Sequence, residues 1–263
     1  MPQPNSPRRK TMFVFCGGMF RSGSTLQYQI VSQLIEDRGL GDRITWHSPE
    51  AFSEIRSLHS SSSQMLAFKA HKLTSEMLKE IEHNGAKVIT AHRDIRDVVV
   101  SAMKKNDWSF RKIWRNDRLR YWTGRFDEWA RQPGALVCRY EDLVTDLHGV
   151  IKSIADHLDI SLSENEIGSL AQEYSLDNQK LRAGQVAIQM QTGRNMSKFD
   201  PHSLLHHNHI ATAGIGEYRK ILLPAQIRAI EDECSDWMMR WGYEADRPQL
   251  TISQRALRMT YRR

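Results

Sequence analysis

Apolar and polar positions follow two alternating patterns along the first two thirds of the chain. Short apolar runs predict strands at 12–16, 66–71, 87–92 and 135–140. Apolar residues three or four positions apart predict helices at 24–39, 75–83, 94–105, 108–132, 145–158 and 163–174. Strands that alternate with helices are typical of a parallel sheet covered by helices on both faces. We therefore predict a single-domain α/β fold over residues 11–246.

The pattern changes after the last of these helices. Residues 177–216 are polar, with scattered glycines and histidines and little periodicity, and predict a long functional or disordered loop. A final helix is predicted over 224–241. The loop contains four histidines that could suggest a metal site, namely His202, His206, His207 and His209. Because no cysteine accompanies them and the segment is irregular, we expect no metal there.

Composition narrows the class of protein. The 263 residues are 40% hydrophobic, which is enough for a sizeable core. No apolar run approaches the roughly 18 residues that a membrane span needs, and no segment resembles a signal peptide. The three cysteines are widely spaced and form no disulfide pattern, which fits a reducing compartment. We therefore expect a cytoplasmic protein without a transmembrane segment.

The net charge of +6 is concentrated at the two ends. Residues 1–10 and 247–263 together carry +8 and contain no acidic residue, so the chain between them carries a net −2. This distribution gives no support to a broad face for specific binding of nucleic acid. We expect two basic tails, 1–10 and 247–263, whose ends are solvated and able to touch an anionic partner or surface.

The segment GMFRSGST, residues 18–25, follows the first predicted strand and opens the first predicted helix. Two glycines five residues apart and two small residues form the skeleton of a phosphate-binding loop. Backbone N–H groups and the helix N-terminus attract a phosphate, and Arg21 adds a charged donor. Ser24 stands where an ATPase or GTPase has lysine, which argues against a nucleoside triphosphatase.

A second phosphate site is indicated at RDIRDVVVS, residues 93–101. Asp94 is expected to cap the helix, with Asp97 completing an acidic variant of a capping box. Ser101 lies almost two turns after Asp94 and shares its helix face. Arg93 and Ser101 could bind one phosphate together, although Arg93 could equally pair with a carboxylate.

These two segments resemble sulfotransferases that use 3′-phosphoadenosine 5′-phosphosulfate (PAPS). RSGST at 21–25 is similar to the family's 5′-phosphosulfate loop, and Arg93 and Ser101 match its 3′-phosphate motif. The resemblance implies a P-loop-type sulfotransferase fold, PAPS as co-substrate and no metal. It implies that Arg21 and the N–H groups of Ser22, Gly23, Ser24 and Thr25 hold the 5′-phosphosulfate. Tyr140, in a segment similar to the family's Tyr-Glu-Asp-Leu, would lie near the adenine.

The resemblance also suggests the catalytic groups. Lys69 and His71 match the family's Lys-x-His, in which the histidine is the base and, by our interpretation, the lysine stabilises charge on the bridging oxygen. Residues two apart on a strand face the same way, so both could reach one transferring group. Glu50 is the alternative base. The remaining rivals are an ATP-dependent phosphotransferase and a nucleotide-binding protein without catalysis.

Two features stay open. The segment from Thr212 to Arg219 resembles the family's Gly-x-x-Gly-Asp-Trp-Lys region but lacks the Arg-Lys-Gly triplet that grips the 3′-phosphate. Four basic residues could replace that triplet, namely Arg194, Lys198, Arg219 and Lys220. The acceptor is a small molecule, carbohydrate or lipid whose site is shaped by 108–129 and 177–210, since their aromatic side chains suit all three.

Overall fold

Five strands form one parallel sheet in this computed structural model, which describes residues 11–191, 199–206 and 214–261. The strand order is β2-β3-β1-β4-β5, with β1 (Met12–Cys16) paired on either side to β3 (Met65–Lys69) and β4 (Ala86–His92). The outer strands are β2 (Gly41–Arg43) and β5 (Leu136–Arg139). The predicted parallel sheet is confirmed, and the three-residue edge strand β2 was too short to leave a pattern.

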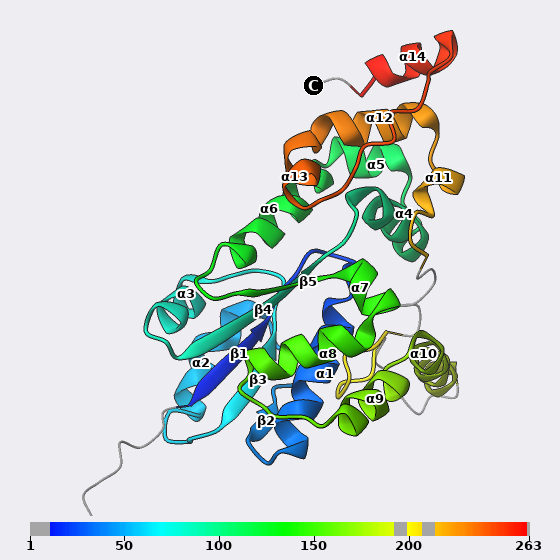
Figure 1. Cartoon of the computed structure of the whole chain (residues 1–263). Coiled ribbons are helices and arrows are strands. Elements are labelled where there is room, and N and C mark those ends of the chain that lie inside the picture. The colour runs from blue at the N-terminus through cyan, green and yellow to red at the C-terminus, as the bar shows by residue number, and fades with distance from the viewer. Residues whose placement is uncertain (1–10, 192–198, 207–213, 262–263) are drawn as a thin grey trace, which may run out of the picture.

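Helices cover both faces of the sheet (Figure 1). One face packs against α1 (Ser24–Asp37), α8 (Leu147–His157) and α9 (Glu164–Glu173) through a cluster of aliphatic side chains. The other face packs against α2 (Phe52–Leu58) and α3 (Ser75–Glu82) through a cluster rich in phenylalanine. Both faces of β1 are therefore buried, which explains its continuous apolar run.

A third core lies beyond one end of the sheet, at the top of Figure 1. It is formed by helices α4 (Ile95–Asn106), α5 (Phe110–Arg115), α6 (Arg118–Ala130), α11 (Tyr218–Ile221), α12 (Pro224–Glu233) and α13 (Ser235–Arg240). The C-terminal α14 (Ile252–Met259) packs on α12, where Arg258 forms an ion pair with Asp232. Tyr261 lies against two aromatic rings of α5. This part of the expected solvated tail is thus folded onto the domain.

Three predicted segments differ from the structure. The helix expected over 108–132 is two helices, because Asp117 adopts a left-handed conformation with φ 54° between α5 and α6. The helix expected over 224–241 is likewise divided between α12 and α13, at Cys234. The segment expected to be an irregular loop begins with α10 (Leu176–Gln191). In α10 a narrow stripe of buried residues, Gln179, Ala183 and Val186, recurs at helical spacing among polar positions.

The remaining elements are short. They are η1 (Pro49–Ala51), which is a single 3₁₀ turn, and α7 (Tyr140–Thr145), which directly follows β5. Across the described ranges, no helix combines the length and apolar character needed to cross a lipid bilayer.

A buried ionic network joins the third core to the start of α4. The Arg96 guanidinium donates to Asp94 Oδ2 and Glu231 Oε1, both at 2.7 Å. Glu231 also accepts hydrogen bonds from the backbone N–H groups of Asp246 and Arg247, at 2.7 and 3.1 Å. Since the Arg96 and Glu231 side chains are each 3% exposed, neither charge can be solvated if its partner is lost.

Replacing Glu231 by alanine should therefore lower the free energy of unfolding by about 3 kcal/mol or more, because it leaves a buried guanidinium undercompensated. Urea unfolding followed by circular dichroism measures this change. Glu233→Ala is the matched control on the same helix. Glu233 pairs with the exposed Arg120, so its loss should cost at most about 1 kcal/mol. Equal losses for the two variants would contradict the assignment.

Candidate active site

The loop between β1 and α1 has a backbone shape that requires glycine. Gly23, the N-cap of α1, adopts a left-handed conformation with φ 82°. A Cβ atom at Gly23 would lie 3.0 Å from a methyl group of Leu143 and 3.1 Å from the Tyr140 ring. The loop therefore fits closely under the start of α7, and a side chain at this position would be strained and crowded.

Backbone donors are concentrated at the start of α1. Within the described residues, the N–H groups of Gly23, Ser24 and Thr25 have no protein acceptor. Because α1 also carries partial positive charge at this end, these groups are available to hold an anion. Ser22 differs from the expectation, since its amide and hydroxyl both donate to the Met19 carbonyl, at 3.3 and 2.7 Å. Ser22 therefore shapes the loop, because its amide and hydroxyl are already hydrogen-bonded within it.

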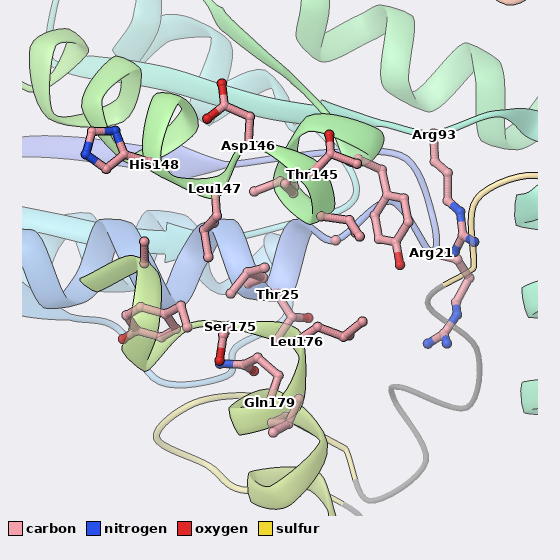
Figure 2. Close-up of a pocket in the computed structure, with 18 residues that line it drawn as sticks. Arg21, Thr25, Arg93, Thr145, Asp146, Leu147, His148, Ser175, Leu176 and Gln179 are labelled. Atoms are coloured by element: carbon pink, nitrogen blue, oxygen red, sulfur yellow. The ribbon is translucent and has the colours of Figure 1, made fainter. Parts of the chain in front are cut away.

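Arg21 connects the loop with α4. Its Nε donates to Ser101 Oγ at 2.8 Å, and Ser101 is buried. Burial, and next the nearby charge of Arg93, lower the pKa of Arg21 to about 10. Figure 2 shows the Arg21 and Arg93 side chains side by side at one end of a cavity. Arg21 therefore lies next to both residues that the sequence assigns to one phosphate, Arg93 and Ser101.

Arg93 is buried at the end of β4 and is held in place by two contacts. Its Nη2 donates to the Gly214 carbonyl at 2.8 Å, and its guanidinium lies 4.0 Å from the centre of the Tyr140 ring. Its Nε is fully buried and has no hydrogen-bond partner among the described residues. A buried N–H without an acceptor is costly, so this group is suited to an incoming anion.

Asp97 positions the segment that lies beside Arg93. Its carboxylate accepts hydrogen bonds from the N–H groups of Gly216 and Tyr218, at 2.7 and 3.0 Å. Asp94 caps α4 as predicted, by accepting from the Arg96 N–H at 2.9 Å. The predicted capping box is nevertheless wrong, because Asp97 bonds to a segment about 120 residues away in the chain and not to its own helix.

The four basic residues considered as replacements for the missing Arg-Lys-Gly triplet differ in their surroundings. Arg219 donates to Asp246 at 2.6 and 2.7 Å, so its charge is paired away from Arg93. Lys220 is exposed on α11. Arg194 and Lys198 fall outside the described residues. Among the described residues of this region, Gly214 accepts a hydrogen bond from Arg93 through its backbone carbonyl.

Lys69 and His71 lie where β3 ends. Lys69 Nζ donates to Thr25 Oγ1 at 2.6 Å, and burial lowers the pKa of Lys69 to about 8. His71 Nδ1 lies 3.2 Å from the Gly18 carbonyl oxygen, which can only accept, so Nδ1 carries the proton and Nε2 is the basic nitrogen. Surrounding protein atoms, and then the Lys69 charge, lower the pKa of His71 below 6.5. Solvent reaches the exposed His71 side chain and weakens both effects. Both effects nevertheless lower the pKa of His71, so its imidazole is neutral at pH 7.

Glu50 is a poorer candidate for the base. It lies in η1 and accepts a hydrogen bond from Lys72 Nζ at 2.8 Å. This bond lowers the pKa of the Glu50 carboxyl group, which makes the carboxylate a weaker base. The carboxylate is also well exposed, so water competes for any proton that it could accept.

A cavity of about 370 Å³ extends from the two arginines between α7, α8 and α10 (Figure 2). Arg21, Gly23, Arg93 and Tyr140 line its charged end. Its remaining walls include Leu143, Leu147, Tyr174, Leu176 and Gln179, which the sequence did not identify as site residues. A polar end and largely apolar walls suit a ligand with an anionic group attached to a flat ring system.

The described residues bring no group of three histidine, cysteine or acidic side chains together as a metal site. Of the four histidines considered in the sequence, His202 and His206 are described, and His207 and His209 lie outside the described residues.

Comparison with known proteins decides the family. A family model described as a sulfotransferase domain matches residues 14–242. The chain belongs to this family. The luciferin sulfotransferase of Photinus pyralis is 30% identical over 129 residues, which are 43% of this chain and 35% of that protein. The match therefore spans about a third of that relative's length.

Solved structures show the same fold. A mouse sulfotransferase, SULT7A1, crystallised with PAP, covers 94% of this chain and 88% of its own length at 14% identity, with a TM-score of 0.64. A retinol dehydratase in complex with androsterone and the inactive cofactor PAP covers 92% and 83% at 18% identity, with a TM-score of 0.59. Both similarities confirm the predicted sulfotransferase fold of the parallel sheet and its flanking helices.

Proposed function

We propose that this sulfotransferase transfers a sulfuryl group from PAPS to a hydroxyl or amine of a small acceptor, leaving 3′-phosphoadenosine 5′-phosphate (PAP). The observation that supports it is the position of Arg21. Arg21 donates a hydrogen bond to Ser101 and lies beside Arg93. It also precedes the turn whose backbone N–H groups at the start of α1 have no acceptor among the described residues. Two anionic groups of one nucleotide would satisfy these donors together.

The donors divide between the two ends of such a nucleotide. The amides of Gly23, Ser24 and Thr25, with Arg21, would hold the 5′-phosphosulfate. Arg93 and Ser101 would hold the 3′-phosphate, and the unpaired Arg93 Nε fits that role. The cavity lined by Tyr140 and the apolar walls would hold the adenosine. Ser24, in the position of the lysine of ATPases, gives no support to the phosphotransferase alternative.

Lys69 and His71 would carry the chemistry. PAPS supplies the sulfuryl group, whose sulfur–oxygen bond to the phosphate breaks as the acceptor oxygen or nitrogen bonds to sulfur. The His71 Nε2 takes the proton from the acceptor, while its Nδ1 stays fixed on the Gly18 carbonyl. The Lys69 ammonium, which donates to Thr25 Oγ1, would donate to the oxygen that bridges sulfur and phosphorus and stabilise its developing charge.

The acceptor is proposed to be a small hydroxylated molecule. The names of the relatives support this class, since one acts on luciferin and another binds androsterone or retinol in its crystal structures. A panel of phenols, steroid alcohols and isoprenoid alcohols with radiolabelled PAPS would identify a working acceptor for the tests of catalysis.

PAP should raise the melting temperature of the protein far more than AMP does. A ligand at 100 times its Kd stabilises a protein by about 2.7 kcal/mol, and each kcal/mol shifts the melting temperature of a domain this size by roughly 2–4 °C. Arg93→Ala should remove most of the preference for PAP over AMP, because a hydrogen bond to a charged group contributes about 1.5–3 kcal/mol. Thermal scanning of each variant against its own ligand-free state measures both effects. Equal shifts with PAP and AMP would refute the 3′-phosphate assignment.

Removal of the base should abolish turnover but not nucleotide binding. His71→Ala should lower kcat by about 10²–10⁴-fold, the usual contribution of general-base catalysis, and leave the PAP-induced thermal shift nearly unchanged. Glu50→Ala is the matched control, because Glu50 is the other candidate base and is exposed. Normal turnover in His71→Ala, together with a loss in Glu50→Ala, would transfer the role to Glu50.

The pH dependence should reflect a neutral histidine. Protonation of Nε2 removes the base as pH falls through the pKa of His71, which protein packing and the Lys69 charge hold below 6.5. The acid limb of kcat/KM for PAPS, which reports the free enzyme, should therefore have its midpoint below pH 6.5. A midpoint at or above that value would show that another group, or an unperturbed histidine, controls the rate.

A further inference from the structure

Lys105 is a further basic residue near the end of the site where Lys69 and His71 lie. Lys105 is four residues after Ser101 on α4, so both side chains project from the same face, one turn apart. Ser101 accepts the hydrogen bond of Arg21, which places Lys105 beside the Arg21 side chain. The sequence motif ends at Ser101 and gave no reason to select Lys105.

Four basic side chains at this end of the site form one cluster and shift one another's pKa values, namely Arg21, Lys69, His71 and Lys105. Partial burial lowers the pKa of Lys105 to about 8, and the Arg21 charge acts in the same direction. Lys105 in turn is the nearby charge that most lowers the pKa of Lys69, and it also lowers that of His71. Lys105 therefore lies within electrostatic reach of Arg21 in the loop after β1 and of Lys69 and His71 at the end of β3.

The cluster has cations without a matching acid. Neither Lys69 nor Lys105 forms an ion pair with a carboxylate in the part of the chain that the structure describes. The neighbouring Lys104, by contrast, pairs with Glu217 at 3.2 Å. Partly desolvated cations that repel one another are unfavourable, so their arrangement favours an anion between them.

The position of the cluster identifies the anion. Arg21 lines the nucleotide cavity, whereas Lys69, His71 and Lys105 do not. Lys69 donates to Thr25 and Lys105 lies beside Arg21, so the cluster adjoins the residues proposed to hold the 5′-phosphosulfate. We propose that Lys105 binds the non-bridging oxygens of the sulfuryl group and completes, with Arg21 and Lys69, a three-cation cradle for it. This inference rests on the proposed use of PAPS.

The test compares two nucleotides that differ only in the sulfuryl group. The Kd values of PAPS and PAP are measured by isothermal titration calorimetry without acceptor, for the wild type and for Lys105→Met, Lys105→Arg and Lys104→Met. Lys105→Met should weaken PAPS binding about tenfold relative to PAP, as expected for one lost charge-assisted contact. Lys105→Arg should restore most of the ratio, and Lys104→Met should leave it unchanged.

The outcomes separate this inference from the proposed function. A wild-type protein that binds neither PAPS nor PAP overturns both. If the wild type binds both nucleotides and Lys105→Met has the same ratio of Kd values for PAPS and PAP, only the role of Lys105 is overturned. Lys105 then makes no contact with the sulfuryl group. Equal weakening of PAPS and PAP in Lys105→Met also overturns it, since a merely structural role would affect the two ligands alike.

Discussion

Four neighbouring parallel strands end at the same edge of the sheet, and the whole site depends on this constraint. The loop with Arg21 follows β1, His71 follows β3, Arg93 follows β4, and Tyr140 follows β5. Ligands of open α/β sheets bind at this carboxyl edge because connections leave it on both sides. Arg21, His71, Arg93 and Tyr140 are thereby brought together, and of these four only Arg21, with φ 64°, has a left-handed backbone.

The positively charged side chains at this edge keep their positions because buried acidic residues nearby hold α4 in place. Asp94 and Glu231 hold Arg96 behind the site, and Asp97 ties α4 to the backbone at Gly216 and Tyr218. Asp94 and Glu231 are paired with Arg96, whereas Asp97 also lies within electrostatic reach of Arg93. The three acids fix the helix that carries Ser101 and Lys105, so that the donors keep their positions when no anion is present to attract them.

The sequence predicted the parts of the site that depend on local chemistry. A strand followed by small residues and a helix predicts an anion-binding turn, and the spacing of Asp94 and Ser101 places both on one helix face. Contacts between distant segments left no such signal. The partners of Asp97 lie about 120 residues away, and the cavity walls at Leu147 and Leu176 come from helices whose pattern shows burial but not what they enclose.

Nucleotide binding would be coupled electrostatically to the strength of the proposed base, His71. In the free protein the Lys69 and Lys105 charges lower the pKa of His71, which weakens Nε2 as a base. An anion held between those ammonium groups offsets their charge, so its arrival raises the pKa of His71 toward the ordinary value. The imidazole is then a better proton acceptor once the donor is in place, and a pKa closer to neutral is the more effective one for general-base catalysis at pH 7. The same cations that we propose to hold the sulfuryl group would thus also tune the residue that activates its acceptor.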